Sequence, residues 1–173
     1  MPKRHDYSKG FTLTELMVTL SVLGILAALA LPGMGELLKN NRLASQTNDI
    51  TTALAYARAE AMRRGARMTL CPSANGADCT GGSDWSVGFI VFADSNRDAT
   101  VSPGEEVLRT IEPLSGNNAL TVSGIGSSLQ FRGSGVVASP GSYKICDDRP
   151  DKGRRISIAS SGSISLTKDV ACP

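Results

Sequence analysis

Glu15 is a carboxylate in an unusual place, because it is the only charged residue in the apolar run Phe11–Leu31. The run has 21 residues, and a helix needs about 20 to cross the roughly 30 Å hydrocarbon core of a bilayer. It therefore predicts a membrane-spanning helix. A carboxylate inside a bilayer costs on the order of 2.5 to 3.5 kcal/mol even on lenient insertion scales, so some interaction must offset the cost of Glu15.

Four cysteines follow the apolar run, on what we expect to be the non-cytoplasmic side: Cys71, Cys79, Cys146 and Cys172. An even number of cysteines in an oxidising compartment favours disulfides, and four cysteines allow three pairings. We favour Cys71 with Cys79 and Cys146 with Cys172, because each bond then ties a loop or a terminus locally. A zinc site is the weaker alternative, since no Cys-x-x-Cys spacing occurs.

A second group of polar residues has the spacing of a 12-residue calcium loop. Asp94, Asn96, Asp98 and Glu105 occupy its first, third, fifth and twelfth places. Ala99, however, stands at the sixth place, where such a loop needs glycine for its sharp turn, and no helices are predicted beside it. We therefore favour a polar turn after a buried strand, in which Asp and Asn bond to their own backbone, and expect no metal.

Basic residues gather late in the chain at Arg149, Lys152, Arg154 and Arg155. Three aspartates are interleaved with them, so a neutralised, solvated loop is the favoured interpretation. Nucleic-acid binding through these four residues is the alternative, because clustered positive charge attracts phosphates.

The overall composition excludes several classes of function. The chain has 18 Lys and Arg against 16 Asp and Glu, and 15 of each remain if residues 1–10 are removed, which argues against a nucleic-acid-binding role for the whole protein. His5, the only histidine, lies in the same segment, so histidine-based catalysis or metal binding is not expected in the remainder. No nucleophile with an adjacent base is evident, and we expect neither an enzyme nor a cofactor.

The helix that carries Glu15 is expected to continue beyond the membrane. Pro32 and Gly33 predict a kink or soft segment rather than a stop, and residues 32–65 then read as an amphipathic helix with Gly65 as its C-cap. Arg63 and Arg64 suit the negative end of the helix dipole. One stripe recurs at spacings of three and four: Leu43, Thr47, Ile50, Leu54, Ala57 and Ala61. Five small residues suit packing on a sheet: Ala53, Ala55, Ala57, Ala59 and Ala61.

The rest of the chain, residues 66–173, reads as short β-prone runs divided by Gly, Ser, Pro and Asn. The segment Ser86–Ala93 is expected to be a buried central strand. The other candidate strands are Arg67–Cys71, Glu106–Ile111, Leu120–Val122, Ser128–Phe131, Ser142–Cys146, Arg155–Ser160 and Ser163–Thr167. The predicted fold class is α+β, with the long N-terminal helix packed on a C-terminal antiparallel β domain.

The stretch Lys9–Leu16, with Gly10, Phe11 and then Glu15, resembles the class III signal of type IV prepilins and type II secretion pseudopilins. The resemblance implies that residues 1–10 are a leader and that a prepilin peptidase cuts between Gly10 and Phe11 and methylates the new amine of Phe11. It also implies that the Glu15 carboxylate neutralises the amine of a neighbouring subunit in a filament, since a buried charge is tolerated when paired. A cleavable secretory signal is the weaker alternative.

The later part of the chain resembles one branch of this family, which covers type II secretion protein H and the FimT/FimU minor pilins. The residues that carry the likeness are Leu70–Pro72, Cys79, Asp84–Asp98, Glu106–Arg109 and Cys146. The resemblance implies a pilin fold, in which residues 11–31 are a transmembrane and filament-core helix and residues 66–173 a periplasmic or extracellular domain.

The implied function is that of a minor pilin or pseudopilin, a structural subunit at the tip or along the shaft of a type II secretion pseudopilus or a type IV pilus. Its partners would be the prepilin peptidase, other pilins and the inner membrane, which the precursor crosses once. A pilus-borne DNA receptor is the alternative. DNA-binding pilins of the FimT branch share a Gly-Arg-x-Arg motif, but this chain has Gly162-Ser163-Ile164-Ser165 at the matching place, so DNA is not favoured.

Overall fold

The computed structural model describes residues 10–172, apart from the side chains of residues 30–33. Most of the predicted leader, including its basic residues and His5, therefore lies outside the described residues. The chain divides into two compact units, residues 1–40 and residues 41–173, which we call the first and the second unit and describe separately.

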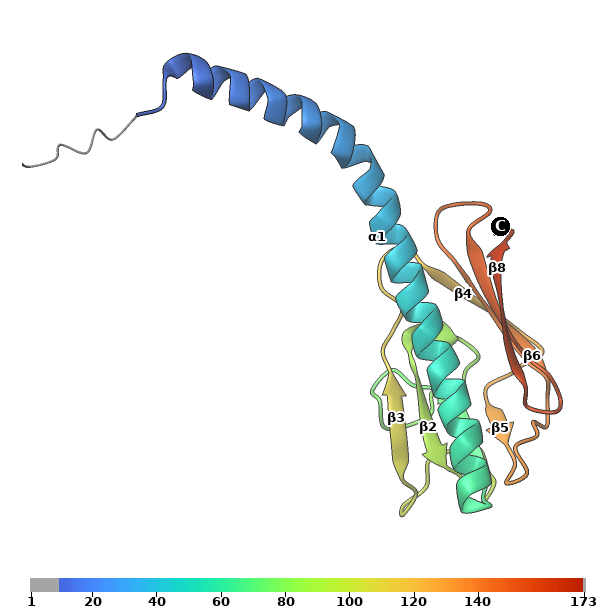
Figure 1. Ribbon diagram of the computed structural model, residues 1–173. Coiled ribbons are helices and arrows are strands. Elements are labelled where there is room, and N and C mark those ends of the chain that lie inside the picture. The colour runs from blue at the N-terminus through green and yellow to red at the C-terminus, as the bar shows by residue number, and fades with distance from the viewer. Residues whose placement is uncertain (1–9, 173) are drawn as a thin grey trace, which may run out of the picture. The chain divides into compact units, whose positions relative to one another are not determined.

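One long helix, α1 (Leu13–Arg64), begins in the first unit and ends in the second (Figure 1). Within the described residues, no unbroken helix is both long and apolar enough to cross a bilayer. A bent pair, Leu13–Leu29 with Met34–Arg64, satisfies the same criteria of length and composition, and the break between its halves includes Pro32 and Gly33. The membrane-spanning assignment of residues 11–31 stays a prediction.

The end of α1 has a clear local cause. Gly65 adopts a φ of 62°, in the left-handed region that side chains disfavour, and the amide of Ala66 donates to the carbonyl of Ala61 at 3.2 Å. This is the Schellman arrangement that ends many helices. The predicted C-cap at Gly65 is thus confirmed.

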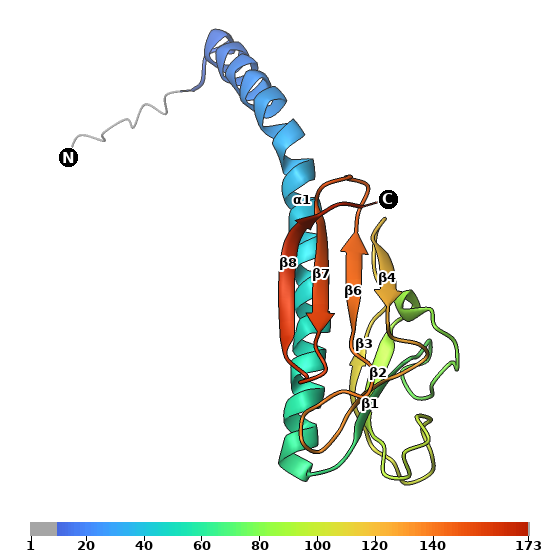
Figure 2. The same cartoon turned by 90° about the vertical axis from the view of Figure 1, so that its right-hand side faces the viewer.

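The second unit contains two four-stranded antiparallel sheets (Figures 1 and 2). One has the order β3-β2-β1-β5 and the other the order β4-β6-β7-β8. The strands are β1 (Met68–Pro72), β2 (Phe89–Ala93), β3 (Val107–Ile111), β4 (Ala119–Ser123), β5 (Leu129–Phe131), β6 (Gly141–Cys146), β7 (Gly153–Ile158) and β8 (Ile164–Val170). Each candidate strand is present, and the predicted α+β class is confirmed.

Several strand boundaries differ from their predictions: β7 begins at Gly153 and ends at Ile158, and β8 extends to Val170. The start of β2 differs for a clear local reason. The segment expected to start a strand at Ser86 instead forms the 3-10 turn η1 (Trp85–Val87), whose N-cap Asp84 accepts from the Ser86 amide. Strand β2 begins only at Phe89, after Gly88. Trp85 packs edge-on against Tyr143 at 5.2 Å between ring centroids and donates its indole N–H to the Gly126 carbonyl, so it is a core residue.

The core lies between the second-unit part of α1 and the inner faces of both sheets. Every member of the predicted helix stripe is buried: Leu43, Thr47, Ile50, Leu54, Ala57 and Ala61. The expectation for the five alanines was partly wrong. Ala55 and Ala59 are exposed, because residues two apart on a helix point in different directions.

Strand β2 is buried on both faces. Phe89 and Val91 join the main core, while Ile90 and Phe92 join a smaller cluster on the other side with Cys71. Two loops and β3 supply the partly buried neighbours of that smaller cluster, through Cys79, Val101 and Val107. The predicted central strand is therefore correct, and its second face is covered by the loops that carry a disulfide and the acidic residues.

Candidate functional site

Glu15 caps the start of α1. Its Oε2 atom accepts from the Thr12 amide at 3.2 Å and from the Thr12 hydroxyl at 3.1 Å, while the Glu15 amide donates to the Thr12 hydroxyl at 3.3 Å. This reciprocal pair is a capping box, which satisfies two amides that the first turn of a helix leaves free. The Thr-x-x-Glu pattern could have predicted it from the sequence.

The two residues of the predicted cleavage site precede this cap. Gly10 is exposed and lies outside any helix or strand, and the Phe11 side chain is 83% exposed. An extended, accessible segment suits a protease substrate. Cleavage and methylation at this position stay a prediction.

The first unit presents apolar side chains around the whole helix. Each of the following is at least half exposed: Phe11, Leu13, Leu16, Met17, Val18, Leu20, Val22, Leu23, Ile25, Leu26, Leu29, Met34, Leu37 and Leu38. A helix that is apolar all round is normally buried in protein or lipid. This surface therefore needs a partner that the chain itself does not supply, and large exposed apolar patches mark sites of interaction.

Both favoured disulfides are present. Cys71 is bonded to Cys79 and Cys146 to Cys172, with Cα–Cα distances of 5.5 and 5.8 Å. The first bond fastens the loop after β1, and the second ties the segment after β8 to the end of β6. No cysteine within residues 10–172 is left free to bind zinc.

The acidic residues of the predicted polar turn converge after β2. Asp94, Asp98 and Glu105 each offer a carboxylate oxygen, and the three oxygens lie within 4.8 Å of one another. Asp94 is only 1% exposed; its Oδ2 atom accepts from the Thr69 hydroxyl at 2.6 Å, whereas its Oδ1 atom is buried without a hydrogen-bond partner in the described structure. Asn96 joins the group by donating to Asp98 at 2.8 Å.

The backbone of this loop is strained at Ala99. Its φ is 62°, a left-handed conformation that costs a residue with a side chain about 1–2 kcal/mol. The bonds expected for a polar turn are also present, since Asp98 accepts from the amide and hydroxyl of Thr100, which lowers the pKa of Asp98. Sequence alone could not show that an alanine takes the conformation for which glycine is usually needed.

The four basic residues of the nucleic-acid alternative do not form one patch. Arg149 is nearly buried and paired with Asp147, and Lys152 lies 3.7 Å from Asp169. Arg154 is partly buried and Arg155 is exposed, at an irregularity in the pairing of β7 with β8. The structure thus neutralises two of the four residues that the sequence places together.

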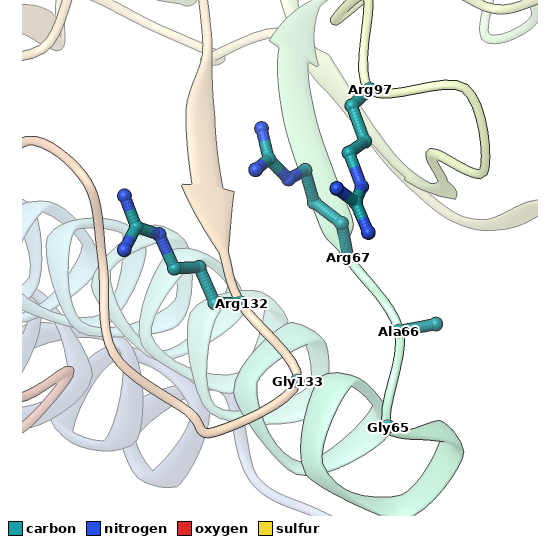
Figure 3. A pocket seen from close by; sticks show the side chains of 6 residues that line it. All are labelled: Gly65, Ala66, Arg67, Arg97, Arg132 and Gly133. Atoms are coloured by element: carbon teal, nitrogen blue, oxygen red, sulfur yellow. The ribbon is translucent and has the colours of Figure 1, made fainter.

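A different set of arginines lines a pocket of about 310 Å³ near the end of α1 (Figure 3). Arg67 lies just before β1, Arg97 in the loop after β2 and Arg132 just after β5, and Gly65, Ala66 and Gly133 complete the lining. Arg97 extends toward Arg67 in Figure 3. Arg67 donates to Gln130 at 2.7 Å. The side chain of Arg132 is directed away from Arg67 and Arg97 in Figure 3. Arginine side chains can bind an anion such as a phosphate. The sequence does not predict this group because its members are far apart in the chain.

Arg63 and Arg64, which the sequence assigns to the helix dipole, both contact Glu60. Arg64 Nε lies 2.6 Å from Glu60 Oε1, and Arg63 donates to both carboxylate oxygens. Hydrogen bonds from these two arginines lower the pKa of Glu60 from 4.5 to about 2. Their role is structural.

Comparison with known proteins gives two family matches. Residues 46–162 match the model for "Type II transport protein GspH", and residues 6–31 match the "Prokaryotic N-terminal methylation motif". The first match covers more than half of the chain and includes β1 to β7.

Similar proteins agree with these matches. The pilin-like protein PilA1 of Thermus thermophilus is 38% identical over 100 residues, which are 57% of this chain and 56% of that protein. The chain thus matches little more than half of the length of this curated relative.

Two solved structures share the fold. The type IV minor pilin FimU of Pseudomonas aeruginosa has a TM-score of 0.61 at 20% identity, covering 76% of this chain and 92% of its own. The minor pseudopilin EpsH of the Vibrio cholerae type 2 secretion system has a TM-score of 0.51 at 15% identity, covering 72% and 94%. At such low identity the likeness supports the pilin fold rather than a particular role.

Proposed function

Because this chain belongs to the type II transport protein GspH family, we propose that it is a minor structural subunit of a helical filament, either a type II secretion pseudopilus or a type IV pilus. The GspH family comprises minor pilins and pseudopilins, which are structural proteins rather than enzymes. The observation that carries the proposal is the first unit. Its helix is apolar on all sides and begins with a capping box formed by Thr12 and Glu15.

The proposed pathway has three steps. The precursor is held in the inner membrane by residues 11–31, with the second unit on the periplasmic side. A prepilin peptidase then cuts between Gly10 and Phe11 and methylates the new amine. Finally, the apolar helices of neighbouring subunits pack together, and each Glu15 pairs with the amine of a neighbour, which fixes the register between subunits.

Processing and assembly can be tested separately. The variant Gly10→Val is expected to keep the full precursor mass, because a branched side chain would obstruct the cleavage site, whereas the unaltered protein loses residues 1–10. Mass spectrometry of the membrane-extracted protein measures this difference. Cleavage of the unaltered chain at any other bond would contradict the assignment of Gly10 and Phe11.

Assembly is tested with Glu15→Gln, which keeps the size of the side chain and removes its charge. We expect normal cleavage but at least a tenfold loss of this subunit from sheared and purified filaments, measured by immunoblotting. The matched control Glu36→Gln removes the next carboxylate along α1 and should assemble normally. Equal incorporation of the Glu15 variant would show that the carboxylate has no part in assembly.

Two further parts of the proposal are more specific: which kind of filament contains this subunit, and where in the filament the subunit lies. We propose a minor component near the tip, as for the branch that the sequence resembles. Cross-linking in cells followed by mass spectrometry would identify the neighbouring subunits. Partners encoded with secretion proteins would indicate a pseudopilus, and other minor pilins would indicate a pilus.

A DNA receptor is the second candidate, and the pocket of Arg67, Arg97 and Arg132 is the feature that favours it. The full chain in detergent would be titrated with duplex DNA over a range of salt concentrations, because phosphate binding weakens steeply as salt rises. Two double variants locate the contact: Arg67→Ala with Arg132→Ala for the pocket, and Arg154→Ala with Arg155→Ala for β7. Salt-sensitive binding lost only in the first pair would support the pocket, and absence of binding at low salt would reject the DNA role.

A further inference from the structure

We propose that the loop between β2 and β3 is a Ca²⁺-binding site, with ligands from the side chains of Asp94, Asn96, Asp98 and Glu105. The site would be independent of filament assembly, because it belongs to the second unit, whereas the assembly residues belong to the first. Its ligand is a hard divalent cation, since the three groups that converge, from Asp94, Asp98 and Glu105, are carboxylates.

The first argument is convergence of like charge. Three carboxylate oxygens, from Asp94, Asp98 and Glu105, lie within 4.8 Å of one another. Carboxylates at such distances repel each other. No lysine or arginine among the described residues forms an ion pair with any of the three. A bound cation would turn this repulsion into attraction.

The second argument is the incomplete bonding of Asp94. This residue is 1% exposed and lies immediately after β2, where one of its oxygens accepts from the Thr69 hydroxyl. Its other oxygen, Oδ1, is buried and has no hydrogen-bond partner in the described part of the chain. Buried carboxylates are normally paired or bound to a metal, so an unpartnered buried oxygen on a residue of the acidic cluster points to a missing ligand.

The third argument is the course of the backbone. The four ligands hold the first, third, fifth and twelfth places of a 12-residue calcium loop, in which a glycine at the sixth place makes the sharp turn. Ala99 holds that place with a φ of 62°. The conformation that glycine normally provides is therefore already present, and the objection raised by the sequence does not apply to the folded chain.

The bonds within the loop show why the site is preformed. Glu105 accepts from the amides of Ser95 and Ser102, at 2.7 and 3.1 Å, and so closes the loop from its last position to its beginning. Asp98 accepts from Thr100 and from the Asn96 amide group. Cation binding must replace some of these bonds, so we expect a dissociation constant of about 10⁻⁴ to 10⁻³ M, typical of extracellular calcium modules.

A cation bound here would stabilise the loop that packs on the second face of β2. Val101 of the loop packs on the cluster of Cys71, Ile90 and Phe92, and the carbonyl of Ala99 lies 3.6 Å from the Cys79 sulfur. Arg97, one of the three pocket arginines, belongs to the same loop. Ca²⁺ is therefore expected to stiffen a surface that includes one wall of the arginine pocket.

The test is a calorimetric titration of the full chain in detergent with CaCl₂, after chelator treatment and removal of the chelator, together with thermal unfolding at rising CaCl₂. We expect binding of one Ca²⁺ per chain and a rise in Tm at millimolar Ca²⁺. MgCl₂ at the same concentrations should give a response at least tenfold weaker, since Mg²⁺ demands stricter geometry and dehydrates reluctantly. No heat and no shift in Tm up to about 10 mM Ca²⁺, or an equal response to both ions, would overturn the proposal.

Three variants make the test specific. Glu105→Gln and Asp98→Asn should each weaken Ca²⁺ binding by tenfold or more, while the control Glu112→Gln, an exposed carboxylate outside the cluster, should bind normally. Circular dichroism in chelator checks that each variant is folded. Ala99→Gly should bind at least as tightly as the unaltered chain, because glycine takes the left-handed conformation without strain. Unchanged binding by both Glu105→Gln and Asp98→Asn would also overturn the proposal.

Discussion

The second unit buries its apolar side chains in a core, whereas the first unit exposes them. In residues 41–173, one stripe of α1 is buried against two sheets, and the other side of that part of the helix is exposed. In residues 13–29 of the same helix, apolar side chains occur on every side, and all the large ones are at least half exposed.

This difference indicates that the second unit stabilises the fold of the subunit, whereas the first unit forms its contacts with a membrane or with other subunits. Burial of apolar area is the main favourable term in folding, and the second unit obtains it within one chain. The first unit can obtain it only from a bilayer or from other subunits. Substitutions in the two units should therefore have different effects. The first prediction below compares the units directly, and the other three test what stabilises the second unit.

Replacing a core leucine should have the largest effect on stability. Leu54→Ala removes a fully buried side chain and should lower the free energy of unfolding of the second unit by roughly 2 to 5 kcal/mol. The matched change Leu23→Ala, on the exposed apolar helix, should leave it unchanged. Denaturation in detergent followed by the fluorescence of Trp85, the only tryptophan, reports on the second unit. A comparable loss from Leu23→Ala would contradict the separation of the units.

Removing the disulfides should have the next largest effect, graded by loop length. The bonds close 26 residues between Cys146 and Cys172 but only 8 between Cys71 and Cys79. Chain entropy then predicts a loss of about 3.5 kcal/mol for the first double Cys→Ser variant and about 2.5 kcal/mol for the second. The same denaturation experiment measures both, and the reverse order would show that local packing outweighs loop entropy.

Tyr143→Phe should stabilise the second unit by up to about 1 kcal/mol, because the buried Tyr143 hydroxyl has no hydrogen-bond partner in the described residues. Burial also raises the pKa of this hydroxyl well above 10.0. The control Tyr56→Phe, at a partly exposed site, should change little. Destabilisation by Tyr143→Phe would reveal a partner for the hydroxyl, such as a buried water.

The smallest expected effect depends on pH. The pKa of Glu60 is about 2 in the folded chain instead of 4.5, so its contribution to stability is complete above pH 4.5 and is lost as the pH falls toward 2. Glu60→Gln should therefore flatten the dependence of Tm on pH between these values, compared with Glu112→Gln. Because the ion pairs reach solvent, the effect should be weak and reduced by salt. An unchanged pH profile would show that the pairs contribute nothing to stability.

The sequence predicts well those features that depend on local periodicity. The buried stripe from Leu43 to Ala61 follows from the helical repeat, and the candidate strands follow from β-prone runs divided by turn residues. The cap at Gly65 depends only on local backbone preferences. These features need no knowledge of distant contacts.

The features that the sequence does not predict depend on tertiary placement. The division into two sheets depends on how the strands pair. The neutralisation of Arg149 depends on its ion pair with Asp147, in which both side chains are nearly buried. The arginine pocket joins residues from three separate segments. The conformation of Ala99 is imposed by the closed loop around it and overrides the preference of an isolated alanine.

The Cys146–Cys172 bond also determines how the second unit would respond to mechanical load. Strand β8 lies at the edge of its sheet, where a pull on the segment after it would open hydrogen bonds to β7 one at a time. The bond instead transmits the pull to Cys146 at the end of β6, on the far side of β7. The load then enters the sheet through β6, which pairs with both β4 and β7, rather than through the edge strand β8 alone.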